Sequence, residues 1–443
     1  MNSEQDTISF PFLGGLRTRW SDWRLKNPSS VVLSGSLVLL MGSMLVSVLN
    51  FVFNVAMARL LGPELFSQAA AIVTLLMLLS CISLSFQMVC AKFVARNETP
   101  NAKSSVYRRI SRQAWQWGAV VALVLAIAQK PITGYLRMPN SWVIAVLAIG
   151  MAFYNQLGVK RGNMQGWCEF PSLSWNYIFE AASKLAIAIL LVELGYGIFG
   201  VVGALSASII AAVLLPSPRN HTQHASAVDE PLPGECIPAS FGEGIQAIVF
   251  FVGQVIINNV DIILVKHFFD SEQAGLYAAI ALVGRLLYFA SWQVVSAMFP
   301  VSAAAGEKEH GKTQVLGVPL LIVSLLCIGF ILVLAIFPGF VMHVVFGEGF
   351  HAADSLLSIY AMSTALYAIA MVLITYEMSR KIANTGWLQL VFSGAIVLAI
   401  YMFHSNLRQV IYVQILLKVV MLLVVSLPFL RSVRTLRRKE VVA

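Results

Sequence analysis

Charged residues are scarce in this sequence. Aspartate, glutamate, lysine and arginine make up 12% of its 443 residues, whereas hydrophobic residues make up 58%. A soluble domain typically carries about 25% charged residues. The shortage therefore excludes an ordinary soluble domain and predicts a protein with many membrane-spanning segments.

Closely spaced metal ligands and a nucleotide-binding domain are also missing. The five cysteines are scattered without the close spacing of metal ligands, so we predict neither a metal site nor a disulfide. Residues 306–313 (GEKEHGKT) match the pattern GxxxxGK[ST], but they lie in a short turn between two predicted membrane helices and not in a nucleotide-binding domain, so we expect no ATP-binding loop. We accordingly expect no cofactor.

Long apolar stretches predict about twelve transmembrane helices, because a helix needs about 20 mostly apolar residues to cross a bilayer. The predicted spans are 31–57, 65–90, 113–130, 141–159, 172–193, 196–215, 241–267, 274–299, 315–337, 353–376, 385–403 and 409–430. We expect an all-α fold with a basic segment 1–30, a six-helix bundle 31–215, a polar linker 216–239, a second six-helix bundle 240–430 and a basic tail 431–443.

The distribution of positive charge predicts the orientation of these helices. With both termini in the cytoplasm, 22 of the 30 lysines and arginines fall in inner segments and five in outer loops. Such a bias is usual for cytoplasmic loops. It also accounts for the net charge of +9 as attraction to anionic membrane lipid, so we expect no nucleic acid partner. The outer loops are short and hold no paired carboxylates, so we do not expect an enzyme.

One hairpin organises the chain and occurs twice. Residues 261–300 contain the end of one predicted helix, a short polar turn and a second helix. Within this segment, 272–280 (EQAGLYAAI) matches 64–72 (ELFSQAAAI) at an offset of 208 residues. Each copy follows an apolar helix and opens another. Two similar halves are typical of transporters.

Two cations lie deep in predicted helices. A charge at the bilayer centre costs about 2.5–3.5 kcal/mol on insertion scales unless it faces a cavity or a partner. We therefore predict that Arg285 and Lys418 anchor a phosphate or an acidic sugar, anions that arginine pairs with in a bidentate way. The alternative is a salt bridge from Arg285 to Asp261, Glu180 or Glu377.

Other polar side chains share helix faces through spacings of three, four or seven residues. The candidates for ion or proton coupling, or for sugar contact, are Asp261, Glu180, Lys184, Asn258 and Gln254. Glu180 and Lys184 are four residues apart, so in the alternative interpretation they neutralise each other. Asp261 lies toward the outer end of its helix, where a wet interfacial position is the alternative.

Several motifs resemble those of a known family. Residues 58–64 (ARLLGPE) are similar to the ARxLGPExFG motif of polysaccharide exporters. Residues 261–267 (DIILVKH), 274–279 (AGLYAA) and 284–285 (GR) resemble the second-half motif of the same proteins. The chain departs from the pattern at 67–68 (SQ), where the family commonly has glycine and an apolar residue. The resemblance is to the O-antigen (Wzx-type) flippases of the multidrug/oligosaccharidyl-lipid/polysaccharide (MOP) superfamily.

This resemblance implies a MATE-like fold with a pseudo-two-fold repeat, in which two six-helix bundles form a V around a cationic cavity. It also implies that the chain flips an undecaprenyl-diphosphate-linked oligosaccharide across the bacterial inner membrane, with a polymerase and glycosyltransferases of the same pathway as partners. The alternatives are a cation-coupled multidrug antiporter and a membrane glycan-assembly enzyme. The basic character of Arg285 and Lys418 disfavours the antiporter, because a pump for organic cations needs an acidic cavity.

Overall fold

The computed structural model describes residues 28–97, 99–216, 245–304, 312–380 and 386–442. We call the part before residue 217 the N-terminal half and the part after residue 244 the C-terminal half. The N-terminal half consists of α2 (Pro28–Arg96), α3 (Pro100–Ile127), α4 (Gln129–Tyr135), α5 (Trp142–Gly166), α6 (Phe170–Leu191), η1 (Val192–Tyr196) and α7 (Gly197–Leu214). The C-terminal half consists of α8 (Ile245–Phe268), α9 (Ser271–Ala304), α10 (Lys312–Ile336), α11 (Pro338–Phe346), η3 (Glu348–Ala353), α12 (Asp354–Arg380), α13 (Gly386–Met402) and α14 (Leu407–Val442).

The predicted transmembrane helices are confirmed. Among the described residues, nine helices are long and apolar enough to cross a membrane, and α13 supplies a shorter apolar helix. Two of the nine are broken at glycines, Gly62 in α2 and Gly195 between α6 and α7, and each therefore contains two crossing segments. All twelve predicted spans are thus accounted for. The segment 217–239 of the predicted linker and the basic segment 1–27 lie outside the described residues, and α14 continues as one helix to residue 442.

A sharp elbow divides α2 into a first leg, residues 28–61, and a second leg, residues 63–96. Gly62 has a φ of 70°, a left-handed conformation that glycine adopts without steric cost. Pro63 follows it at the start of the second leg, where its missing N–H is not needed for a helical hydrogen bond. The Gly-Pro pair therefore ends one membrane helix and begins the next with almost no loop.

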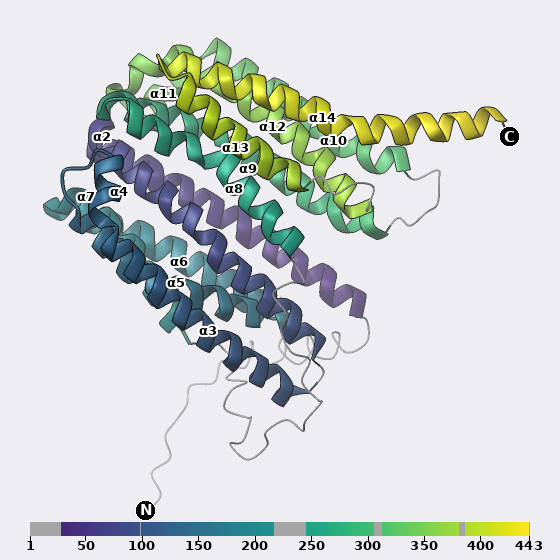
Figure 1. Ribbon diagram of the computed structural model, residues 1–443, viewed down its shortest axis with the longest axis horizontal. Coiled ribbons are helices and arrows are strands. Elements are labelled where there is room, and N and C mark those ends of the chain that lie inside the picture. The colour runs from purple at the N-terminus through teal and green to yellow at the C-terminus, as the bar shows by residue number, and fades with distance from the viewer. Residues whose placement is uncertain (1–27, 98, 217–244, 305–311, 381–385, 443) are drawn as a thin grey trace, which may run out of the picture.

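The two halves meet along α2, which packs against α8 and α9. We call this contact the seam. In Figure 1 the ribbons of the halves converge where the elbow of α2, α4 and α11 gather, and they splay apart toward the opposite end. We call the converged end the elbow end. It carries the short turns that the sequence assigns to the outside.

The repeated sequence forms the core of the seam. Residues 64–72 open the second leg of α2, and residues 272–280 lie in the first turns of α9. Small side chains of both copies, including Ala71 and Ala279, are fully buried. At the elbow end Gly275 lies so close to the backbone of Pro63 that a Cβ atom at Gly275 would overlap it. Small residues allow helix backbones to approach this closely in membranes, and here they join the two repeats.

Candidate functional site

Asp261 is the centre of a buried polar cluster in the C-terminal half. Its Oδ1 lies 2.9 Å from Nη2 of Arg285, and the carboxylate is 2% exposed. Its Oδ2 accepts hydrogen bonds of 2.9 Å from the hydroxyls of Tyr277 and Tyr360. Gln414 completes the cluster by donating to the Tyr277 hydroxyl at 2.8 Å. The four residues around Asp261 come from α9, α12 and α14, so the cluster ties three helices to α8.

Both predicted anion anchors lie in or beside this cluster. Arg285 forms the salt bridge to Asp261 that was the alternative interpretation, and its Nε is buried without an acceptor among the described residues. Lys418 is 3% exposed and donates to the Ser363 hydroxyl at 3.0 Å. It lies close enough to Asp261 and Arg285 for their charges to act on it. Asp261 is thus buried rather than at a wet interface. We call these side chains, with Lys418, the C cluster.

The two predicted amides of α8 face aromatic rings. Gln254 donates to the Tyr288 hydroxyl, while Asn258 bonds back to the Gln254 carbonyl at 2.9 Å. The ring of Tyr288 lies 6.4 Å from that of Trp292 and 5.8 Å from that of Tyr367. Amides beside flat aromatic faces suit sugar hydroxyls and the C–H face of a pyranose. The structure therefore places Gln254, a predicted sugar-contact residue, beside a group of aromatic rings.

A second buried cluster lies in the N-terminal half. Nη2 of Arg161 lies 2.5 Å from Oε2 of Glu180, and the Arg161 Nε donates to Oδ1 of Asn176 at 2.8 Å. The guanidinium also lies 3.9 Å from the centre of the Tyr177 ring. Lys184 is the second cation here, and we call these five residues the N cluster.

Glu180 and Lys184 were predicted as a possible self-neutralising pair, but the structure gives each a different partner. Glu180 binds Arg161, as described above. Lys184 donates to Oδ1 of Asn50 on the first leg of α2 and lies 4.9 Å from the centre of the Phe53 ring. Lys184 is close enough to Glu180 and Arg161 to interact electrostatically with both. It is half-buried and makes no ion pair among the described residues.

Arg161 and its neighbour Lys160 follow directly after the predicted span 141–159, and the structure continues the helix through both. Both lie within α5, and Arg161 is 5% exposed. Lys160 donates to three carbonyls at the end of α7, those of Ala212, Val213 and Leu215. A sequence signal existed, because glycines recur every four residues through this stretch at 158, 162 and 166. Such a stripe allows close helix packing, and here it lies against the second leg of α2.

The elbow end holds two cations, Arg59 and Lys266, that hydrogen-bond to the opposite half. Arg59 reaches from α2 to the end of α11, where it donates to Val345 O at 2.7 Å and to Val344 O. Lys266 is 1% exposed and bonds the hydroxyls of Ser67 at 2.8 Å and Ser271 at 2.7 Å. Because Arg59 and Lys266 each hydrogen-bond to a residue of the other half, they hold the two halves together at the elbow end.

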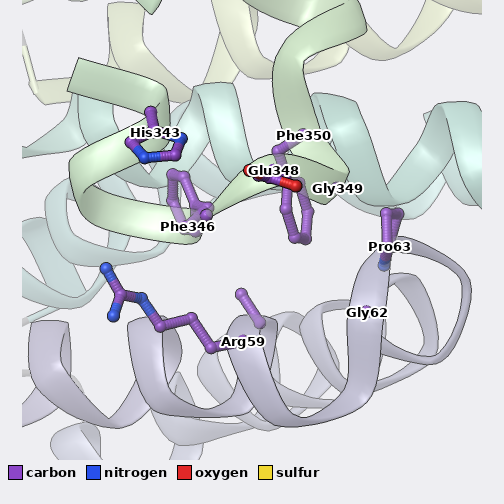
Figure 2. Close-up of a pocket in the computed structure, with 10 residues that line it drawn as sticks. Arg59, Gly62, Pro63, His343, Phe346, Glu348, Gly349 and Phe350 are labelled. Atoms are coloured by element: carbon purple, nitrogen blue, oxygen red, sulfur yellow. The ribbon is translucent and has the colours of Figure 1, made fainter. Parts of the chain in front are cut away.

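An aromatic contact and a pocket complete the elbow end. His267 of α8 lies with its ring 3.9 Å from that of Tyr135 of α4, and its Nδ1 is 2.8 Å from the Tyr135 carbonyl. Figure 2 shows Arg59 on one side of a pocket of about 460 Å³, with His343 and Glu348 on the other. The pocket lies between α2 and the turn from α11 to η3, so both halves line it.

Comparisons with known proteins agree with this architecture. A family model described as polysaccharide biosynthesis protein matches residues 56–354. A search of the curated proteins finds no match. Among solved structures, the chain is similar to an inward-facing multidrug resistance MATE family transporter of the MOP superfamily, with a TM-score of 0.67, 12% identity, and coverage of 88% of this chain and 97% of that one.

Two further solved structures show the same fold. An outward-facing multidrug resistance MATE family transporter has a TM-score of 0.60 and 14% identity, with 91% of this chain and 96% of that chain covered. A MOP superfamily transporter from Pyrococcus furiosus, described as having a binding pocket of reverse polarity, has a TM-score of 0.61 and 12% identity, with 90% and 95% covered. Since the family model spans more than half of the chain, this protein belongs to the family of polysaccharide biosynthesis proteins and has the membrane-transporter fold of the MOP superfamily.

Proposed function

We propose that this protein flips a lipid-linked oligosaccharide, carried on undecaprenyl diphosphate, from the inner to the outer leaflet of the bacterial inner membrane. Membership of the polysaccharide biosynthesis family and the transporter fold support this proposal. The protein is a transporter rather than an enzyme. Its substrate comes from glycosyltransferases and passes to a polymerase of the same pathway, and both termini lie in the cytoplasm.

The surplus of positive charge inside the halves carries the proposal. The C cluster contains Arg285 and Lys418 against one acid, Asp261. The N cluster likewise contains two cations against one acid. Uncompensated charge in a membrane protein is costly and marks a pathway for a substrate of opposite sign. A diphosphate supplies that charge.

The seam offers surfaces for the rest of the substrate. The first leg of α2 carries a stripe of polar residues, Ser43, Ser47, Asn50 and Asn54. Ser43 is exposed and the other three are half-buried. Across the seam, Gln254 of α8 lies beside the aromatic rings of α9 and α12. Hydroxyls, amides and ring faces provide a polar path for sugars, while the polyprenyl tail stays in lipid.

Alternating access needs two ends that open in turn. In this conformation the elbow end is closed by Arg59, Lys266 and His267, whereas the ribbons splay apart at the other end (Figure 1). The closed end is the one predicted to face outside, so we take this conformation as closed to the outside. Transport then requires the elbow contacts to break. Glu180 and Asp261 remain the candidates for ion coupling, and both are held by arginines.

The second candidate function is a multidrug antiporter, which the likeness in fold to multidrug transporters favours. The charge of the clusters opposes it, because an organic cation would meet a surplus of positive charge. The polarity of the binding pocket varies within this fold. The Pyrococcus furiosus transporter is described as having a binding pocket of reverse polarity, which suggests a different function. The polarity of this chain therefore favours an anionic substrate.

The sidedness of lipid-linked oligosaccharide in cells tests the proposal. Deletion of the gene should trap the oligosaccharide in the inner leaflet, and the wild-type protein should restore its transfer. The variant Arg285→Ala, at wild-type abundance in the membrane, should not restore it if Arg285 anchors the substrate. Normal sidedness after deletion, in cells without a redundant transporter, would contradict the proposed function.

A further inference from the structure

The two clusters differ in how accessible their spare cation is. In the C cluster Lys418 is 3% exposed and is enclosed by the packing of α12 and α14. In the N cluster Lys184 is half-buried, and its partner Asn50 on the first leg of α2 is half-buried as well. Lys184 therefore lies where α6 meets the first leg of α2, on a face that is not enclosed.

The only acid of the N cluster is already engaged. Glu180 lies 2.5 Å from Arg161, whose guanidinium is further held by Asn176 and by the ring of Tyr177. Lys184 has a neutral hydrogen-bond acceptor, Asn50, and an aromatic face below it. Its charge is therefore the one that remains to be neutralised in the N cluster.

The surroundings of Lys184 fit a phosphate group. An asparagine amide has both an acceptor oxygen and two N–H donors, so Asn50 can hold Lys184 through Oδ1 and donate from Nδ2 to a phosphate oxygen.

The geometry points to Lys184 and Asn50 as the site that binds a phosphate group of the lipid diphosphate in this conformation. This inference rests on the proposed function and assigns the first contact of the head group to the N-terminal half. Arg161 and Glu180 are positioning residues, since they occupy each other and leave Lys184 free for the ligand. Arg285 and Lys418 act after the seam has rearranged, because both are enclosed here.

Binding to the purified full-length protein in detergent tests this site. The probes are undecaprenyl diphosphate, the neutral alcohol undecaprenol, and inorganic diphosphate, with affinity measured by native mass spectrometry or ligand-induced thermal shift. Wild type should prefer undecaprenyl diphosphate over undecaprenol. Lys184→Gln should weaken its binding about ten-fold or more, since a charge-assisted hydrogen bond is lost, whereas Lys184→Arg should retain most of it.

Two further variants make the test specific to charge. Asn50→Asp should weaken binding like Lys184→Gln, because it gives Lys184 a permanent counter-charge without removing the lysine. Lys130→Gln removes a cation in α4, away from the N cluster, and should bind as wild type does. Tight binding of inorganic diphosphate alone would identify a free diphosphate as the ligand and overturn the lipid assignment.

The outcomes separate this inference from the proposed function. If Lys184→Gln and Asn50→Asp bind undecaprenyl diphosphate as tightly as wild type, the site is wrong, while restored oligosaccharide sidedness in cells would still support a flippase. If wild type shows no preference for the diphosphate over the alcohol, the inference is also wrong. Normal sidedness after gene deletion would instead remove the proposed function itself.

Discussion

Buried charges in this protein are held by partners on other helices. Asp261 receives three hydrogen bonds, from one arginine and two tyrosines, and is almost fully enclosed. A carboxylate so paired is tolerated in the interior, but removing one partner leaves the other charge without compensation. Arg285 therefore has a structural partner even though it was predicted as a substrate anchor, and the two roles need separate measurements.

The variant Asp261→Asn should destabilise the protein by about 3–5 kcal/mol, because the Arg285 charge would remain buried without an acid. Thermal unfolding in detergent measures this loss. The double variant Asp261→Asn with Arg285→Gln removes both charges and should recover much of the stability. If the double variant is stable but does not restore oligosaccharide transfer, Arg285 or Asp261 has a role beyond the salt bridge. Equal stability of Asp261→Asn and wild type would show that the pair is not structural.

At the scale of the element, α2 is the helix of the N-terminal half that packs against the C-terminal half. Its elbow places Pro63 against Gly275, and its residue Arg59 bonds the carbonyls that end α11. The last carbonyls of a helix lack intrahelical partners and carry partial negative charge, so a cation there is favourable. The elbow end is thus held by backbone contact and by a cation that caps a helix of the other half.

The variant Gly275→Val should hold the elbow end apart, because its Cβ cannot fit beside the Pro63 backbone. Labelling of Ala70→Cys in the seam by a membrane-impermeant maleimide from outside should increase. Gly329→Val is the matched control, since Gly329 lies in α10 with nothing within 4 Å of its Cβ position. Unchanged labelling in Gly275→Val would mean that this contact does not control the elbow end.

The variant Arg59→Gln should also favour opening of the elbow end. It removes charged hydrogen bonds to Val344 and Val345, each worth about 1.5–3 kcal/mol. The population open to the outside should therefore rise about ten-fold or more, seen as faster labelling of the same Ala70→Cys reporter. Arg59→Lys should restore closure only in part, because an ammonium cannot present the planar pair of donors. Slower labelling than in wild type would contradict the capping role.

At the scale of the whole molecule, the halves form one seam and must separate at the elbow end for transport to the outside. Ser67 and Lys266 meet across that seam at 2.8 Å. With native cysteines replaced, a cleavable bis-maleimide joining Ser67→Cys to Lys266→Cys should stop transfer of lipid-linked oligosaccharide, and cleavage of the linker should restore it. Variants that carry only one of the two cysteines, treated with the same reagent, provide the control. Continued transfer in the cross-linked protein would show that the elbow end need not open.

Much of the fold was predictable, whereas the pairing of its charges was not. Hydropathy located twelve spans, and the match of 64–72 to 272–280 identified the helices that meet in the seam. The burial of Arg161 was not predicted, because a basic residue just after a predicted span resembles the start of a loop. The hydrogen bonds of Arg59 and Lys266 were not predicted, since each joins one half of the molecule to the other.

The sequence by itself determined the number, length and order of the membrane helices, because each must supply about 20 apolar residues and satisfy its own backbone hydrogen bonds. The break at Gly62 and Pro63 was likewise local. Only the tertiary structure decided that Glu180 binds Arg161 instead of Lys184, and that Arg59 caps α11 some 285 residues away. Side-chain direction and helix packing decide such pairs, and neither is a property of spacing along one helix.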